Sequence, residues 1–161
     1  MVSSSKMSSF SLRALLVWVG GTLVAGFVVG LLGGDISSYT QLQAPPLAPP
    51  SWLFFPVWIV LYLAMGTAAY LVSRSGDIDR GDALQLYVWQ LAVNVLWPLL
   101  YFRLEWRLFA FFWILLLIAL VALTINAFCR HNRTAGWLLI PYLLWLLFAA
   151  YLNLGYWILN R

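Results

Sequence analysis

Hydrophobic positions in this chain form five long runs without a charged side chain, and short polar segments separate them. Each run holds about 20 residues, the length of α-helix that crosses roughly 30 Å of bilayer hydrocarbon. The runs are apolar on every face, whereas the strands of a membrane β-barrel hold about 10 residues and alternate between two faces. We therefore predict five transmembrane helices, at residues 14–32, 52–72, 84–102, 108–128 and 135–159.

Composition agrees with this pattern and defines the class of protein. Hydrophobic residues make up 64% of the chain and charged residues 9%, against about 25% charged residues in a globular domain. The chain is therefore expected to be an all-α integral membrane protein. Five spans account for most of the 161 residues, so we expect a single domain, residues 1–161. The loops between later spans are short, which predicts antiparallel neighbouring helices, and Thr134 is the expected N-cap of the last helix.

The lid loop, which we define as residues 33–51, is the longest segment outside the predicted helices. The stretch from Tyr39 to Trp58 holds five of the chain's seven prolines. Proline fixes φ and removes a hydrogen-bond donor, and irregular backbone at a membrane is tolerated only where protein or water satisfies its polar groups. A stiff, aromatic segment at this place predicts a lid over a ligand site.

Basic residues mark the ends of the spans and predict the orientation of the chain. The net charge is +4, but no basic run or cluster occurs, so nucleic-acid binding is not expected. One side of the predicted bundle carries Lys6, Arg13, Arg74, Arg80, Arg130 and Arg133, and the other carries Arg103, Arg107 and Arg161. The positive-inside rule then predicts a cytoplasmic N-terminus, with the lid loop and the C-terminus on the opposite side.

Polar and aromatic residues follow one face of the third helix. They recur at steps of three and four positions, which places them along one stripe: Tyr87, Gln90, Asn94, Trp97 and Tyr101. An unpaired amide in hydrocarbon costs several kcal/mol. Gln90 and Asn94 should therefore point into the bundle, towards another helix, a water or a ligand. Hydrogen bonding between helices is the alternative to a ligand role.

Two further stripes carry aromatic residues. The fifth helix has Tyr142, Trp145, Ala149, Asn153 and Tyr156 at helical spacing, and the second has Trp58, Tyr62, Met65 and Ala69. Trp58, Trp97 and Trp145 lie deeper than the indoles at the span ends. Together with the amides they indicate a site for a large, planar, mostly apolar molecule. Ordinary aromatic packing is the alternative interpretation.

Motifs for metal binding, hydrolysis or proton pumping are absent from the sequence. No carboxylate lies inside a predicted span, and neither His131 nor Cys129 has partners at ligand spacing. We therefore expect no metal site and no required cofactor, and assign no catalytic residue. In the first helix, Gly26-x-x-x-Gly30 could form a dimer face or pack within the protomer.

The order of these segments resembles the tryptophan-rich sensory protein, or translocator protein (TspO/MBR), family, which includes the peripheral benzodiazepine receptor. The lid loop is similar to the family signature WYxxLxKPxWxPP through Tyr39, Leu42, Pro45, Pro49 and Pro50. The blocks PVWIVLYLAMGTAAYLV, QLAVNVLWPLLYF and GWLLIPYLLWLLFAAYLN follow in the family's order. The resemblance implies a five-helix fold, often dimeric, with a cavity beneath the first loop. In the family this cavity binds tetrapyrroles such as protoporphyrin IX and haem, and sterols in animal members.

Carried over by position, the resemblance implies ligand hydrogen bonds from Trp58 and Asn94. It implies cavity walls from Tyr39, Pro45, Trp97, Trp145 and Ala149. Gln90 and Tyr62 are additional ligand-binding candidates from the stripes. The loop departs from the signature at Ser38, Ala44 and Leu47, where the family has tryptophan, lysine and tryptophan. Without that cation and those indoles, ligand preference is expected to differ from that of better-known members.

The expected function is that of a membrane receptor or translocator that binds porphyrin or haem, or a similar flat hydrophobic ligand, with a stress-sensing or regulatory role. Its expected partners are the tetrapyrrole, membrane lipid and a second copy of the chain in a homodimer, in a bacterial envelope. One alternative is light-dependent oxidative degradation of porphyrin, with Trp58 and Trp145 as the reactive groups. Another is a sterol- or lipid-binding scaffold.

Overall fold

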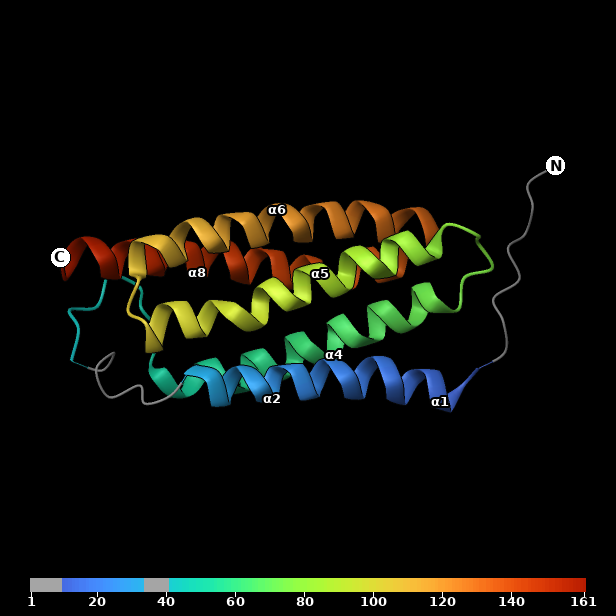
Figure 1. Cartoon of the computed structure of the whole chain (residues 1–161), viewed down its shortest axis with the longest axis horizontal. Helices are drawn as coiled ribbons and strands as arrows, with labels where there is room; N and C mark the ends of the chain where they lie inside the picture. Colours follow the sequence, from blue (N-terminus) through green and yellow to red (C-terminus); the bar gives the residue numbers. More distant parts are fainter. Residues whose placement is uncertain (1–9, 34–40) are drawn as a thin grey trace.

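The computed structural model of the chain describes residues 10–33 and 41–161, which contain helices and no strand (Figure 1). Five helical segments in these residues are long and apolar enough to cross a membrane, and they confirm the predicted all-α bundle of transmembrane helices. They cover Leu12–Leu31, Ser51–Ser73, Arg80–Arg103, Arg107–His131 and Arg133–Leu159.

The first span consists of α1 (Leu12–Leu15), a π-helical turn (Leu16–Gly20) and α2 (Gly21–Gly33). It packs against α4 (Phe54–Ser73), which follows a short 3₁₀ turn, Ser51–Leu53. A Cβ atom added to Gly66 of α4 would lie 2.6 Å from the Cα of Val19. The two spans therefore approach backbone to backbone, and only glycine fits at this point.

Proline lies where the third and fifth spans depart from regular α-helix. The third span is α5 (Arg80–Pro98), and it widens into a π-helical turn, Leu99–Arg103. Pro98 has no N–H to donate to the carbonyl of Asn94, which weakens the regular helix at this point. The fifth span is α7 (Arg133–Leu138) followed by α8 (Ile140–Leu159), and it breaks just before Pro141.

The cap of the last span corrects one sequence expectation. Asn132, and not Thr134, caps α7: its side chain accepts a hydrogen bond of 3.1 Å from the backbone N–H of Ala135. Thr134 already lies inside the helix. Asparagine and threonine are both good N-caps, so the sequence alone does not distinguish two candidates that lie two residues apart.

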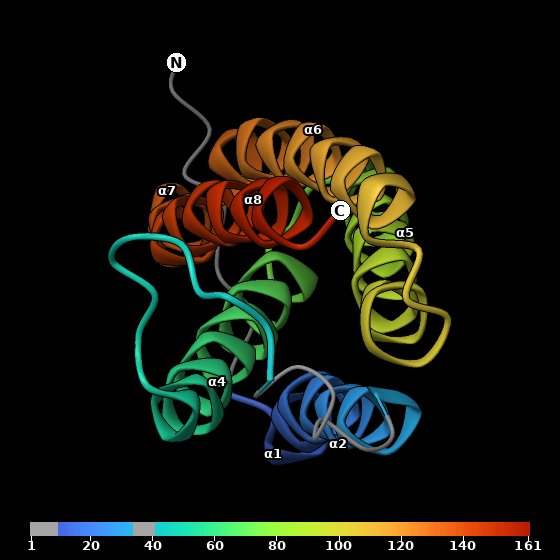
Figure 2. The same ribbon diagram turned by 90° about the vertical axis from the view of Figure 1, so that its left-hand side faces the viewer.

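The helices form a ring, seen from the lid-loop end in Figure 2. Next to α2 lie α4 on one side and α5 on the other; α6 (Arg107–His131) packs against α5 and α8, and α4 completes the ring against α7 and α8.

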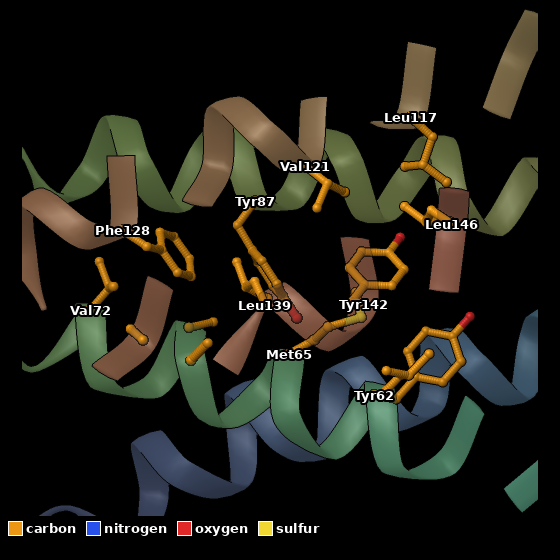
Figure 3. Close-up of a cluster of buried hydrophobic side chains, with 14 of the residues drawn as sticks. Tyr62, Met65, Val72, Tyr87, Leu117, Val121, Phe128, Leu139, Tyr142 and Leu146 are labelled. Carbon is orange, nitrogen blue, oxygen red and sulfur yellow. The ribbon is translucent and has the colours of Figure 1, made fainter. Parts of the chain in front are cut away.

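The tightest core lies in the half of the bundle farther from the lid loop. Figure 3 shows its side chains pointing toward one another from α4, α5, α6 and the start of the fifth span. Met65, Val72 and Phe128 are fully buried, and the ring of Tyr87 stacks on that of Phe128 with centroids 5.8 Å apart. The hydroxyl groups of Tyr87 and Thr22 lie 2.6 Å apart and form a hydrogen bond between α5 and α2.

Candidate ligand-binding site

The other half of the bundle, toward the lid loop, is hollow. A cavity of about 430 Å³ lies between α2, α4, α5, α6 and α8, within the size range of small-molecule sites. None of its described lining residues is acidic or basic. The aromatic lining residues are Phe54, Phe55, Trp58, Tyr62, Trp97, Tyr101, Phe102, Trp145 and Tyr156. Such a surface suits a large apolar ligand with flat faces.

A hydrogen-bonded triad closes the deep end of the cavity. The hydroxyl of Tyr62 on α4 donates to Oδ1 of Asn94 on α5 at 2.7 Å. Nδ2 of Asn94 donates to the hydroxyl of Tyr142 on α8 at 2.9 Å. Trp58 stacks on the ring of Tyr62 and meets that of Tyr142 edge-on. Asn94 therefore joins three helices, which is the interhelical pairing that the sequence left open as an alternative.

Six of the residues assigned to the ligand site from the sequence line this cavity together: Trp58, Tyr62, Asn94, Trp97, Trp145 and Ala149. Gln90 is buried on α5 but is not among the lining residues. Pro45 does not line the cavity either; it is buried above it, against Gly155 of α8. Tyr39 and Ser38 lie outside the described residues. Ligand contact at these positions stays a prediction.

The described part of the lid loop, residues 41–50, is fastened to α8. The backbone N–H of Gln43 donates to the side chain of Asn160 at 2.8 Å, and that side chain donates back to the carbonyl of Gln43 at 3.0 Å. The hydroxyl of Tyr151 donates to the carbonyl of Pro46 at 2.7 Å. These bonds hold the loop over the end of the bundle where the cavity lies.

The lid loop also contains a strained turn. Residues 45–48 form a turn in which the N–H of Ala48 donates to the carbonyl of Pro45. Its third residue, Leu47, has φ of 65°, a conformation that favours glycine or asparagine. Leu47 is one of the positions where the chain departs from the family signature, and its side chain is 83% exposed. It therefore adds no indole to the cavity wall.

The sequence placed Asn153 on an interior stripe but did not assign it to the ligand site, and it is the most informative of the lining residues left out. Its amide lies on the stripe of α8 and is 2% exposed. Neither Oδ1 nor Nδ2 has a hydrogen-bond partner among the described residues, and the same holds for the indole N–H groups of Trp97 and Trp145. An asparagine inside a predicted span was the available signal. Tyr101 and Tyr156 were also on the stripes, whereas nothing in the sequence pattern marked Phe54 or Phe102.

The small residues of α2 take part in this site. A Cβ on Gly26 would lie 2.5 Å from the ring of Tyr62, so the tyrosine packs directly on the backbone of α2. Gly30, one turn further, has no atom within 4 Å of such a Cβ and borders the cavity. Gly26 thus packs within the protomer. The sequence had left this open, with a dimer face as the other interpretation.

Residues 10–33 and 41–161 contain no group of three or more His, Cys, Asp or Glu side chains that could hold a metal ion. His131 instead lies 2.9 Å from a carboxylate oxygen of Asp77. This contact ties the end of α6 to the loop between α4 and α5, far from the cavity.

Comparison with known proteins matches the chain to one family. The model of the TspO/MBR family matches residues 14–158. The chain is 41% identical to a translocator protein of Ovis aries over 147 residues, covering 86% of this chain and 87% of that protein. It is 37% identical to the tryptophan-rich protein TspO of Chlorobaculum tepidum over 145 residues, with coverage of 86% and 90%. It is also 35% identical to protein CrtK of Rhodobacter capsulatus over 125 residues, with coverage of 76% and 78%.

Proposed function

The chain belongs to the TspO/MBR family, and from this premise we propose that it is a receptor that binds a tetrapyrrole in its intrabundle cavity. Its family and its five apolar helices make it an integral membrane protein of the receptor or translocator type. Protoporphyrin IX or haem is the proposed ligand, bound reversibly and not as a resident cofactor. Binding would serve a stress-sensing or regulatory role, and a homodimer is the proposed assembly.

One observation carries the proposal: the cavity combines a wide aromatic lining with a few buried polar groups and no charged lining residue among those described. A porphyrin is flat, largely apolar and polarisable, so indole and phenol rings offer it stacking surfaces. Trp58, Trp97 and Trp145 come from three different helices. A flat ligand between them would be contacted on more than one side.

Quenching of tryptophan fluorescence by protoporphyrin IX, measured on the purified protein in detergent, tests this function. We expect saturable quenching by the porphyrin and a loss of affinity in Trp58→Phe and Asn94→Ala. A sterol titrated in parallel distinguishes the scaffold alternative. If the sterol binds and the porphyrin does not, the protein is a lipid-binding scaffold; if neither substitution changes affinity for any ligand, the site is elsewhere.

A second candidate function is light-dependent oxidative degradation of the bound porphyrin, with dioxygen as the oxidant. The observation that favours it is that Trp58 and Trp145, two oxidisable indoles, both line the cavity. Illumination of the protein–porphyrin complex in air distinguishes the two functions. A pigment spectrum that is unchanged while binding persists would leave only the receptor function.

We also propose the orientation that the charges predict, with the N-terminus in the cytoplasm of a bacterial cell and the lid loop outside it. Arg103 ends the third span and Arg107 begins the fourth at the lid-loop end, and Arg74, Arg80 and Arg130 lie at the other. Alkaline phosphatase fused after Arg161 should be active, since it needs export to fold. An inactive fusion would reverse the assignment.

A further inference from the structure

Asn153 carries an unused hydrogen-bonding capacity into the cavity. Its side chain is almost fully buried on α8, and both of its polar atoms lack a partner within the described part of the chain. An amide can donate two hydrogen bonds and accept two. Leaving such a group unpaired inside a membrane costs several kcal/mol. A bound group that pairs with it therefore recovers this free energy.

The other amide of the cavity, Asn94, is in a different state. Its Oδ1 and Nδ2 are already paired with Tyr62 and Tyr142. Tyr142 is 11 residues before Asn153 on the same helix, which corresponds to about 16 Å along the axis. The buried amide of Gln90, one turn from Asn94, also lacks a partner among the described residues but does not line the cavity. Of the two amides that line the cavity, the one at the deep end is therefore paired within the protein and the one at the lid end is not.

The unpaired groups are mostly donors. The indole nitrogens of Trp97 and Trp145 are buried without a partner, and an indole N–H can only donate. Asn153 adds its Nδ2. A ligand oxygen that accepts hydrogen bonds would satisfy these groups, whereas a hydroxyl-free hydrocarbon edge would leave them unpaired.

A positive charge at the lid end favours a carboxylate among such acceptors. Arg107, at the start of α6, follows Trp106, whose backbone N–H donates to the carbonyl of Leu100 at 3.0 Å, next to the lining residue Tyr101. The Arg107 side chain is 17% exposed, and its Nε lacks a hydrogen-bond partner. Glu105 lies 3.6 Å from the guanidinium, but its own side chain is half exposed, so solvent weakens the pair. Much of the Arg107 charge remains available to an anion across low-dielectric surroundings.

The described lid loop supplies no competing charge. Residues 41–50 contain neither an acidic nor a basic residue, and Ala44 stands where the family signature has lysine. A cation that serves an anionic ligand at this end must therefore come from elsewhere among the described residues. Arg107 begins α6 at this end of the bundle, close to the turn that carries Tyr101 and Phe102, although it is not itself a lining residue.

We propose that Asn153 binds the carboxylate end of an apolar, flat ligand at the lid end of the cavity, with Arg107 supplying the favourable charge. This inference rests on the proposed function, because it concerns the same cavity, and it adds the chemical class of the ligand and its direction. The acid lies toward the lid loop, and the apolar body extends toward Trp58 and the Asn94 triad.

The test compares acids with their neutral esters in the purified full-length protein. The probes are protoporphyrin IX with its dimethyl ester, and pyrenebutyric acid with its methyl ester. The variants are Asn153→Leu, which removes the amide, and Asn153→Asp, which keeps its size and opposes an anion. Arg107→Gln removes the supporting charge. Asn126→Leu, on the exposed face of α6 and away from the lining residues, is the matched control.

We expect the wild type and Asn126→Leu to prefer each acid over its ester. Asn153→Leu and Asn153→Asp should weaken acid binding by about tenfold to a hundredfold, the range of a hydrogen bond to a charged group. They should weaken ester binding only a few-fold, because an ester carbonyl accepts the weaker, neutral hydrogen bond. Arg107→Gln should reduce the preference for the acid over its ester by less than the Asn153 substitutions do. Salt screens the charge of Arg107, so the acid preference should fall with added salt in the wild type and should not in Arg107→Gln. Ester binding also shows whether each variant is folded, and Asn153→Asp decides the case if Asn153→Leu does not fold.

The outcomes separate this inference from the proposed function. If protoporphyrin IX binds but the acid preference is absent, or is the same in both Asn153 variants, the carboxylate assignment is wrong and the porphyrin receptor stands. If neither porphyrin binds while pyrenebutyric acid binds in an Asn153-dependent manner, the proposed ligand is wrong and the acid site stands. If no acid is preferred over its ester, the inference is wrong.

Discussion

The two halves of the bundle are both built from apolar residues, but one half is closely packed and the other encloses a cavity. In the half away from the lid loop, small residues bring the helices into close contact: Gly66, Ala68, Ala69, Ala83 and Ala135. In the lid half, indole and phenol rings hold the helices apart around 430 Å³ of empty space. Lipid is as apolar as leucine, so close packing is what holds membrane helices together. The packed half therefore supplies the stability that allows the other half to stay hollow.

The largest difference between the halves should appear when a packed ring is removed. Phe128→Ala deletes a fully buried side chain that stacks on Tyr87, and the loss of free energy of unfolding should be about 3–5 kcal/mol. Phe112→Ala, on the lipid-exposed face of the same helix, should change it by less than about 1 kcal/mol. Unfolding in mixed micelles of increasing SDS content measures both. Equal losses would contradict the assignment of stability to the packed half.

The second-largest difference between the halves should appear when one methyl group is added to a glycine in each half. Gly66→Ala places a Cβ against the backbone of Val19 and Trp18, which cannot rotate away, and should destabilise the protein by about 1–3 kcal/mol. Gly30→Ala has open space beside the cavity and should be neutral or slightly stabilising. The same unfolding assay compares them. If Gly66→Ala is neutral, the spans do not meet as closely as described.

Filling the hollow half should affect binding and leave stability nearly unchanged. Ala149→Leu extends a side chain from α8 into the cavity and should lower affinity for protoporphyrin IX about tenfold, about 1.4 kcal/mol. Fluorescence quenching measures affinity, and the unfolding assay is the control. Unchanged affinity would place the ligand outside this cavity.

The smallest effect should come from loosening the lid loop. A Cβ at Gly155 would lie 2.7 Å from the Cβ of Pro45, so Gly155→Ala should displace the loop from α8. We expect porphyrin dissociation to accelerate a few-fold, with a change in stability below about 1 kcal/mol. Stopped-flow displacement measures the rate, and Gly81→Ala, at the start of α5 and away from the lining residues, serves as the control. A slower or equal rate would show that the loop does not cover the exit.

The sequence predicted which helix faces turn inward, but not how deep the cavity reaches. The five spans followed from uncharged length, and the stripe on α5 placed Tyr87, Gln90, Asn94 and Trp97 on one interior face. Along that face the environment changes from packed to hollow: Tyr87 stacks on Phe128, while Trp97 borders the cavity. Gln90 lies on the packed side of this boundary and so does not reach the cavity. Periodicity shows which face of a helix turns inward, but how far the cavity extends along that face depends on side chains from other helices.

The sequence also could not predict the hydrogen-bond partners of the buried amides. Asn94 and Asn153 are both amides in apolar spans, and only the arrangement of α4 and α8 around α5 shows that Asn94 meets two tyrosine hydroxyls. Asn153 meets none among the described residues. Residue type identified both groups, but tertiary contacts decide which one remains available to a ligand.

The reciprocal hydrogen bonds between Gln43 and Asn160 make the described loop and the end of α8 one mechanical unit. Gln43 takes part through its backbone alone, so a spin label can replace its side chain, whereas Asn160 must be kept. A label at Gln43 paired with one at the exposed neighbour Leu159 would therefore keep a constant separation through any movement of the loop that carries α8 with it. A pair that joins Gln43 to Phe55 on α4 crosses the boundary between the loop unit and the rest of the ring. Distance measurements intended to follow entry into this protein belong on that second pair.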